Sequence, residues 1–250
     1  MVGSVRASVP DRHFVSSTIF AIDTAAERCT LALARGDRVE HQEGEPGRTH
    51  LEHVMPAVTV FFTGCAVRPA QCDAFAFASG PGSFTGLRIA CTVVQGLALA
   101  VGRPVIAVGN LHALAVAAHL RRGGEARRIL AVIDARMQQA YWAVFDARPE
   151  SWVEVVPSSL CDTRDLPSIM EEWQPDLCAG EARWLHQILA GREGEIVDAR
   201  VDATVVAAIA REKFARGEVL RAQDVSPAYT RDRVALTVAQ RRDAREGRAP

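Results

Sequence analysis

The stretch Ser79-Gly80-Pro81-Gly82-Ser83-Phe84-Thr85-Gly86-Leu87-Arg88 joins an apolar run at 74–78 to a long segment rich in small residues. Because glycine reaches positive φ and proline fixes φ, the Gly-Pro-Gly triplet predicts a tight turn. The apolar run before it predicts a buried strand, and Ser83 or Thr85 can cap the helix that follows. Such a turn is either an anion-binding site or a well-capped structural connection, and the turn alone leaves both open.

The helix predicted at 83–101 has apolar residues on two faces. Its clearly polar residues share one stripe, made of Arg88, Thr92 and Gln95. One apolar face can cover the sheet of its own domain, whereas the other needs a second helix, from this chain or from a partner. The glycine at position 96 costs about 1 kcal/mol relative to alanine, which indicates close backbone approach. The first face contains Leu87, Cys91, Val94, Ala98 and Val101, and the second contains Ile89, Val93, Gly96 and Ala100.

Length and composition are those of a globular protein with one large domain or two small lobes. The chain has 250 residues, of which 48% are hydrophobic and 24% charged. A net charge of −1 gives no overall attraction to nucleic acid or to an anionic membrane. None of the six cysteines lies in a C-x-x-C pair, which argues against a zinc ribbon. With no secretory signal and no apolar run of membrane-spanning length, we expect a cytoplasmic protein without a membrane partner.

The predicted strands and helices occur in a similar order twice along the chain. The first round has strands at 18–22, 29–34, 38–42, 74–78 and 104–108, with helices at 49–63 and 83–101. The second round has strands at 129–133, 140–145, 152–156, 177–179 and 195–197, a weak helix, and helices at 182–189 and 203–216. The opening strand of each round ends in an aspartate, Asp23 or Asp134. The repeat lies in element order, with little shared sequence, so a chance arrangement stays open.

Two lobes with one internal plan favour a duplicated α/β fold in which each lobe has a mixed five-stranded sheet and flanking helices. An aspartate that closes the first strand of each lobe is the layout of the actin-like ATPase superfamily, which has a ribonuclease H-like fold. We expect the N-terminal lobe at 17–110 and the C-terminal lobe at 111–225. We also expect a disordered extension at 1–16 and a C-terminal segment with a basic tail at 226–250.

Four motifs resemble the TsaB family, also called YeaZ, over roughly residues 18–236. The nine residues from Gly80 to Arg88 are similar to the family's most distinctive motif. The supporting motifs are Ala21-Ile22-Asp23-Thr24-Ala25, Asp134-Ala135-Arg136-Met137 with Ala140-Tyr141-Trp142-Ala143, and Pro227-Ala228-Tyr229-Thr230-Arg231.

The resemblance implies an accessory subunit that is not active alone and needs no cofactor. TsaB proteins are non-catalytic relatives of TsaD, with which they form a heterodimer. Together with the ATPase TsaE, the pair supports transfer of a threonylcarbamoyl group to the adenosine 3′ of the anticodon in tRNA. The resemblance therefore implies TsaD and TsaE as partners, with tRNA as a further candidate within the complex and a homodimer when the chain is alone.

The residues at the phosphate-loop and metal-ligand positions test whether the chain has an active site. An actin-like phosphate loop needs glycine after the first-strand aspartate, but Asp23 is followed by Thr24, Ala25 and Ala26. The metal-binding histidine pair of TsaD-type proteins matches Leu111 and Ala115 here. We therefore expect no catalytic, cofactor-binding or metal-binding residue.

The remaining histidines give no convincing ligand set. His112 and His119 lie seven residues apart, too far for one metal on a straight helix. His50 and His53 could share a metal but lack an obvious third ligand. Two enzymatic alternatives stay open: a metal-dependent peptidase of the glycoprotease type, which metal content would reveal, and an actin-like ATP phosphotransferase, which nucleotide binding would reveal.

The predicted partner surface lies on the helices at 49–63 and 83–101. Two apolar faces cannot both be covered by one sheet, and an exposed apolar patch usually marks an interface. The basic stretch at 231–250, with six arginines against three acids, is either solvated or touches tRNA phosphates. The residues expected at the TsaD interface are Leu51, Val54, Met55, Val58, Ile89, Val93, Gly96 and Ala100.

Overall fold

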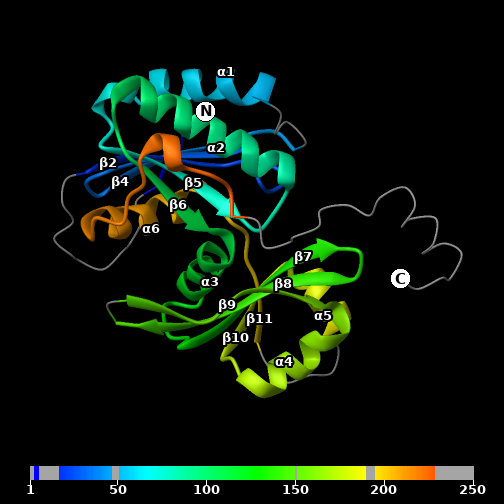
Figure 1. Ribbon diagram of the computed structural model, residues 1–250. Helices are drawn as coiled ribbons and strands as arrows, with labels where there is room; N and C mark the ends of the chain where they lie inside the picture. The colour runs from blue at the N-terminus through cyan, green and yellow to red at the C-terminus, as the bar shows by residue number, and fades with distance from the viewer. Residues whose placement is uncertain (1–2, 6–16, 47–50, 150, 190–194, 229–250) are drawn as a thin grey trace, which may run out of the picture.

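The computed structural model describes residues 3–5, 17–46, 51–149, 151–189 and 195–228, which form two lobes (Figure 1). The sheet of the first lobe has the order β1-β4-β3-β2-β5-β6. Strands β2, β5 and β6 are parallel, whereas β3 and β4 run antiparallel to their neighbours, so the sheet is mixed. Its strands are β1 (Gly3–Val5), β2 (Thr18–Asp23), β3 (Thr30–Arg35), β4 (Arg38–Glu43), β5 (Ala74–Gly80) and β6 (Val105–Gly109).

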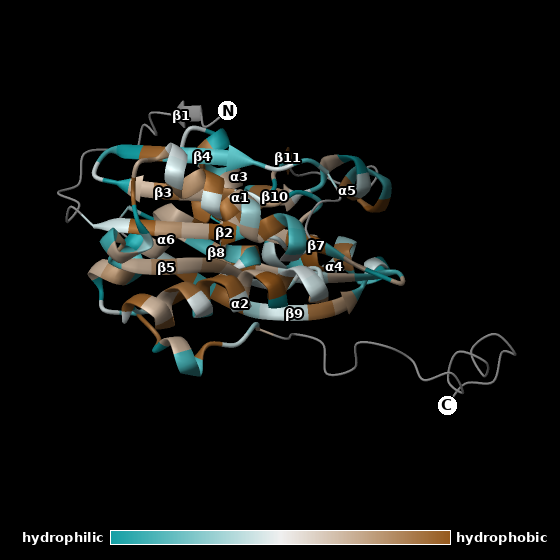
Figure 2. Cartoon of the chain, turned by 90° about the horizontal axis from the view of Figure 1, so that it is seen from above, coloured by the Kyte–Doolittle hydropathy of each residue, from teal (hydrophilic) through white to brown (hydrophobic). Residues whose placement is uncertain are grey.

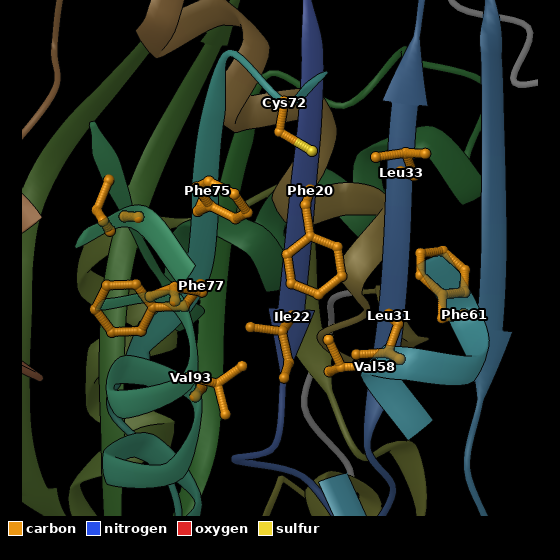
Figure 3. Close-up of a cluster of buried hydrophobic side chains, with 14 of the residues drawn as sticks. Phe20, Ile22, Leu31, Leu33, Val58, Phe61, Cys72, Phe75, Phe77 and Val93 are labelled. Atoms are coloured by element: carbon orange, nitrogen blue, oxygen red, sulfur yellow. The ribbon is translucent and has the colours of Figure 1, made fainter. Parts of the chain in front are cut away.

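One face of this sheet is covered by α1 (Leu51–Gly64) and α2 (Phe84–Val101). Aromatic side chains fill the space below α1, where the ring of Phe20 lies 6.2 Å from that of Phe61 and 6.1 Å from that of Phe75 (Figure 3). Fully burying one such side chain contributes about 2 kcal/mol. The central strands β2, β3 and β5 are hydrophobic, whereas β4, which lies between β3 and the edge strand β1, is hydrophilic, as expected when only the centre is covered on both faces (Figure 2).

The sheet of the second lobe has the order β11-β10-β7-β8-β9 and is also mixed. Helix α3 (Asn110–Arg121) covers one face, and α4 (Leu166–Trp173) and α5 (Ala182–Ile188) cover the other. Its strands are β7 (Arg128–Arg136), β8 (Gln139–Arg148), β9 (Ser151–Asp162), β10 (Leu177–Gly180) and β11 (Glu195–Asp198). Two mixed sheets with flanking helices confirm the two-lobed α/β architecture expected from the sequence.

Helix α6 (Ala203–Ala215) lies where the sequence did not place it. The expected boundaries put it in the second lobe, but α6 packs on the free face of the first sheet, against β2, β3, β5 and β6. Its buried residues Val206, Ala207 and Ala210 meet the small side chains of Ala21 and Ala32 there. Because those strands are apolar on both faces, the first sheet needs a second covering layer. The chain therefore crosses between the lobes twice.

The segment after α6 also returns to the first lobe. Leu220 exchanges two backbone hydrogen bonds with Val105, at 2.8 and 2.9 Å. The side chain of Gln95 donates to the carbonyl of Ala222 at 2.8 Å, in the short helix η3 (Ala222–Asp224). The N–H of Ala228 donates to the carbonyl of Ser79 at 2.8 Å. Residues 216–228 thus form a strap that ends beside the Gly-Pro-Gly turn.

Several expectations concern the ends of the chain and the start of α1. Residues 3–5, which we expected to be disordered, form β1 beside β4, and the rest of the extension lies outside the described residues. The basic tail after Ala228 and the first two residues of the predicted helix at 49–63 also lie outside them. Among the described helices, α2 alone is long and apolar enough to cross a membrane by length and composition, contrary to our expectation of no such run. Its inner face packs on the first sheet.

Candidate functional site: the motif loop and the outer helical face

The loop between β5 and α2 is closed by the turn that follows β2. The hydroxyl of Thr24 donates to the carbonyl of Gly86 at 2.7 Å, and the N–H of Ser83 donates to the carbonyl of Ala25 at 3.3 Å. A Cβ at Gly86 would lie 1.9 Å from the Thr24 carbonyl oxygen, and one at Gly82 would lie 3.1 Å from the Ala25 Cβ. The glycines of the motif therefore allow two backbone segments to touch.

The start of α2 is capped as the sequence predicts. Ser83 is the N-cap, and its hydroxyl accepts the N–H of Gly86 at 3.3 Å. Residues 24 and 25 occupy the approach that an anion would need at this helix end. Of the two interpretations of the turn, the geometry favours the capped structural connection.

The first glycine of the motif joins three parts of the chain. The N–H of Gly80 donates to the side-chain oxygen of Asn110 at 2.9 Å. Its φ is 123°, and a Cβ there would lie 2.7 Å from the carbonyl oxygen of Ala228. Glycine is required at this position both by the backbone angle and by the strap that lies against it.

Asp23, at the end of β2, and Asp134, within β7, have different surroundings. Asp23 is fully buried, and its Oδ1 accepts the N–H of Ala25 at 2.8 Å. Its Oδ2 has no hydrogen-bond partner among the described residues, and burial raises the pKa of this carboxyl to about 7. Asp134 instead forms an ion pair with Arg136 at 3.1 Å, in a turn where Arg136, Met137 and Gln138 all have positive φ. Its charge is therefore balanced within the second lobe.

The histidines singled out in the sequence act as packing or surface residues. The ring of His112 stacks on Phe145 with centroids 5.3 Å apart, and His112 and His119 both contact Trp152. Burial lowers the pKa of His112 to about 4. His53 is partly exposed beside Glu52, and His50 lies outside the described residues.

The positions that match the TsaD histidine pair, Leu111 and Ala115, are buried in the core of the second lobe. In the part of the chain that the structure describes, no three potential ligands among His, Cys, Asp and Glu converge on a metal-binding position. The arrangement of these side chains gives no fit for a metal centre of the TsaD type.

The outer faces of α1 and α2 form the outer helical face, which we define by its exposed residues. Met55 is 41% exposed, Val60 62% and Leu99 56%, and a Cβ at Gly96 would meet nothing within 4 Å. All three large apolar side chains lie on the two helices that cover one face of the first sheet. The outer helical face consists of Met55, Val60, Gly96, Leu99 and Ala100.

The eight residues expected at the interface divide into two groups. Val54, Val58 and Val93 are buried in the core of the first lobe, so their side chains are not available at the surface. Ile89 is partly buried and packs against the same core. These residues hold α1 and α2 on the first sheet. Met55, Gly96 and Ala100 are exposed, and the side chain of Leu51 is outside the description. The sequence missed Val60 and Leu99, although Leu99 follows Gly96 at helical spacing.

Comparison with known proteins finds relatives that are named for tRNA threonylcarbamoyladenosine biosynthesis. Residues 44–183 match the family model of TsaD, tRNA N6-adenosine threonylcarbamoyltransferase. TsaB of Escherichia coli, a tRNA threonylcarbamoyladenosine biosynthesis protein, is 33% identical over 225 residues, which cover 87% of this chain and 96% of that protein. TsaB of Haemophilus influenzae is 28% identical over 232 residues, covering 87% of this chain and 94% of that protein.

Solved structures agree with the sequence relatives. YeaZ from Pseudomonas aeruginosa superposes with a TM-score of 0.75 at 33% identity and covers 85% of this chain and 99% of its own. A structure from the same organism is described as an uncharacterized protein with similarity to peptidase YeaZ. It superposes with a TM-score of 0.76 at 32% identity and covers 86% of this chain and 100% of its own. Identity of this level over nearly the whole length of these proteins shows that the chain belongs to the TsaB (YeaZ) family.

Proposed function

We propose that this chain is a non-catalytic subunit of tRNA threonylcarbamoyladenosine biosynthesis that binds TsaD through the outer helical face. Membership of the TsaB family gives the chain its role in this biosynthesis. The binding partner and the absence of catalysis are our inference. The observation that carries the partner surface is the open position of Gly96 beside exposed apolar side chains.

Among the residues that the structure describes, nothing explains the glycine at position 96. In a helix interior it is less favourable than alanine by about 1 kcal/mol, and no side chain or backbone within 4 Å would obstruct a Cβ. A helix from a partner that packs closely at this point would explain the small residue. Leu99 on the same helix, and Met55 and Val60 on α1, would supply exposed apolar area for such a contact.

The motif loop supports a non-catalytic role. Thr24 and Ala25 lie against Gly82, Ser83 and Gly86, where a phosphate would have to bind. Leu111 and Ala115 stand at the positions of the TsaD histidine pair and cannot coordinate a metal. The chain would then provide a binding surface, and TsaD would carry out the catalysis.

The proposal extends to the rest of the complex. With TsaD and the ATPase TsaE present, we expect transfer of the threonylcarbamoyl group to the adenosine 3′ of the anticodon, in the cytoplasm. In the absence of TsaD, a second copy of the chain would cover the same apolar face. The chain alone should not modify tRNA.

Gel filtration of mixtures with TsaD tests the surface. Gly96→Arg places a charged side chain at the contact, and we expect it to abolish co-elution while the thermal melt stays within a few degrees of the unmodified chain. Leu120→Arg is the matched control, because Leu120 is also an exposed apolar helical residue, 50% exposed on α3, and we expect it to retain binding. Co-elution of Gly96→Arg with TsaD would exclude the proposed surface.

A further inference from the structure

We propose that the first turn of α6 is a pH-sensitive latch that ties the end of the second lobe to the sheet of the first lobe. The latch consists of Asp23, Thr30, His41, Asp202 and Ala203. It is independent of the partner surface proposed above, since none of these residues lies on the outer helical face.

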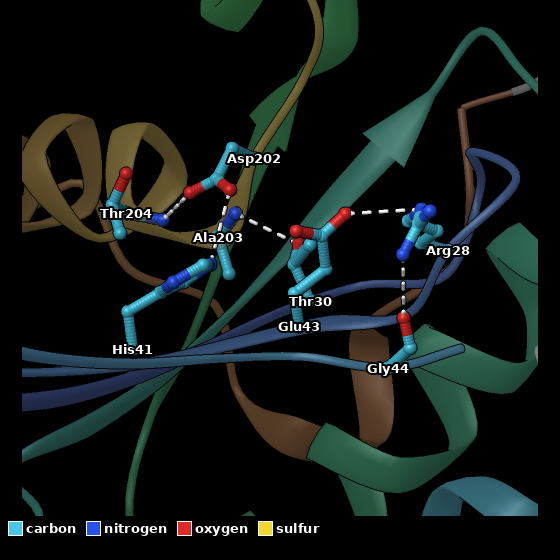
Figure 4. A network of polar contacts seen from close by, with 8 residues as sticks. All are labelled: Arg28, Thr30, His41, Glu43, Gly44, Asp202, Ala203 and Thr204. Atoms are coloured by element: carbon cyan, nitrogen blue, oxygen red, sulfur yellow. Dashed lines mark hydrogen bonds and ion pairs between the residues drawn. The ribbon is translucent and has the colours of Figure 1, made fainter. Parts of the chain in front are cut away.

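The latch stands where the chain crosses back between the lobes. Asp202 caps α6 by accepting the N–H of Thr204 at 2.6 Å, and its other oxygen lies 3.1 Å from the Nε2 atom of His41 (Figure 4). The N–H of Ala203 donates to the hydroxyl of Thr30 at 3.0 Å. Two strands of the first lobe, β3 and β4, thus hold the first turn of a helix that arrives from the second lobe.

Other groups that face the latch come from β2, β3 and β4. Asp23 at the end of β2 lies close enough to Asp202 for their charges to interact. Immediately before β3, burial raises the pKa of the Cys29 thiol to about 12, so it stays neutral. On β4, Glu43 is paired with Arg28 at 3.2 Å. The groups whose charge changes near neutral pH are therefore His41 and Asp23.

His41 and Asp23 each release a proton as the pH rises, and the loss of either proton weakens the latch. The hydrogen bond from His41 to Asp202 raises the pKa of His41 above its usual value. Burial, with a smaller contribution from the charge of Asp202, raises the pKa of Asp23 to about 7. Burial opposes the charge on Asp202, but its hydrogen bonds with His41 and Thr204 prevail and lower its pKa.

The sign of the pH dependence follows from these directions. A group whose pKa is raised by folding stabilises the folded state below its unfolded pKa and loses that contribution as the pH rises through the folded pKa. In mildly acidic solution His41 is positive, Asp202 negative and Asp23 neutral. As the pH rises through the folded pKa values of both groups, His41 becomes neutral while Asp23 and Asp202 both carry negative charge, so the ion pair is replaced by repulsion.

Opening of the latch should be local. The middle of α6 stays anchored by Val206, Ala207 and Ala210 on the first sheet, where burial does not depend on pH. Release of the first turn would free the crossing at 199–203, while the packing of α3 on α6 and β5 remains. A higher pH would then loosen this crossing without unfolding either lobe.

Amide hydrogen exchange on the full chain measures the latch directly, because the N–H groups of Ala203 and Thr204 are its donors. After correction for base-catalysed exchange, we expect protection of these two amides to fall about tenfold between about pH 6 and pH 8.5, which corresponds to one pKa unit of coupling. A corrected protection that does not change over this range overturns the proposal.

Variants separate the charges from the hydrogen bond. Asp23→Asn and His41→Gln should each flatten the pH dependence, whereas Thr30→Val should lower protection at every pH and leave the slope unchanged. His53→Gln is the matched control, since His53 is a partly exposed histidine outside the latch, and it should behave as the unmodified chain. If Asp23→Asn fails to fold, the profile of His41→Gln decides, and an unaltered slope there overturns the proposal.

Discussion

The two lobes share a sequence pattern, an apolar strand with an aspartate toward its end, but differ in what surrounds that aspartate. Asp23 is fully buried below the closed motif loop and has one unpartnered oxygen. Asp134 keeps 26% of its side chain exposed and is paired with Arg136. In the first lobe the neighbouring turn packs against α2, whereas Met137 in the corresponding turn of the second lobe is 67% exposed. The same residue acquires different chemistry because the layers that cover it differ.

The largest effect should come from opening the closed turn of the first lobe. Gly86→Ala places a Cβ 1.9 Å from the carbonyl oxygen of Thr24. The backbone holds both atoms in place, so a side-chain rotation cannot relieve the clash. We expect destabilisation on the order of 3 kcal/mol or more, or loss of folding, measured by urea unfolding. A variant within about 0.5 kcal/mol of the unmodified chain would show that the two segments do not need their close contact.

The buried aspartate should make the stability of the chain depend on pH. Asp23→Asn removes the ionisable group, whose pKa of about 7 lies well above the ordinary 3.8. Because folding raises this pKa, the unmodified chain should lose on the order of 2 kcal/mol more than Asp23→Asn between about pH 5 and pH 8.5. Parallel unfolding curves for the two proteins across this range would mean that Asp23 is not desolvated.

The open position on α2 should respond in the opposite direction from the closed one. Gly96→Ala adds a methyl group in free space, and we expect it to stabilise the isolated chain by about 1 kcal/mol. Gly86→Ala is its counterpart on the same helix. Thermal melts of the isolated chain check the sign, and a lower melting temperature for Gly96→Ala would show an unrecognised contact at that position.

The smallest effect should come from the aspartate of the second lobe. Asp134→Asn removes an ion pair with Arg136, whose side chain is 86% exposed, so we expect a loss of about 0.5 kcal/mol or less. Chemical denaturation with and without added salt checks this expectation, and a loss comparable to that expected at Asp23 would make the two aspartates equivalent.

Local elements could be predicted from the sequence because short-range signals specify them. The N-cap at Ser83, the buried face of α2 at Leu87 and the order of strands followed from capping chemistry and apolar periodicity. The candidate site was predicted less completely. Spacing alone predicted that Val93 faces a partner, but its side chain is buried in the core of the first lobe. The exposed residues Val60 and Leu99 were not among the predicted residues.

The sequence by itself determined most of the element order, the two-lobed α/β class and the family, since each depends on contiguous residues; β1 and α3 were absent from the predicted order. Tertiary structure alone decided that α6 and the strap return to the first lobe, that Thr24 closes on Gly86, and that Asp23 is desolvated while Asp134 is paired. These features join residues far apart in the chain, such as Ala203 and Thr30, which are 173 positions apart. Periodicity reports which face of an element is apolar, but the partner of that face is set by packing of the whole chain.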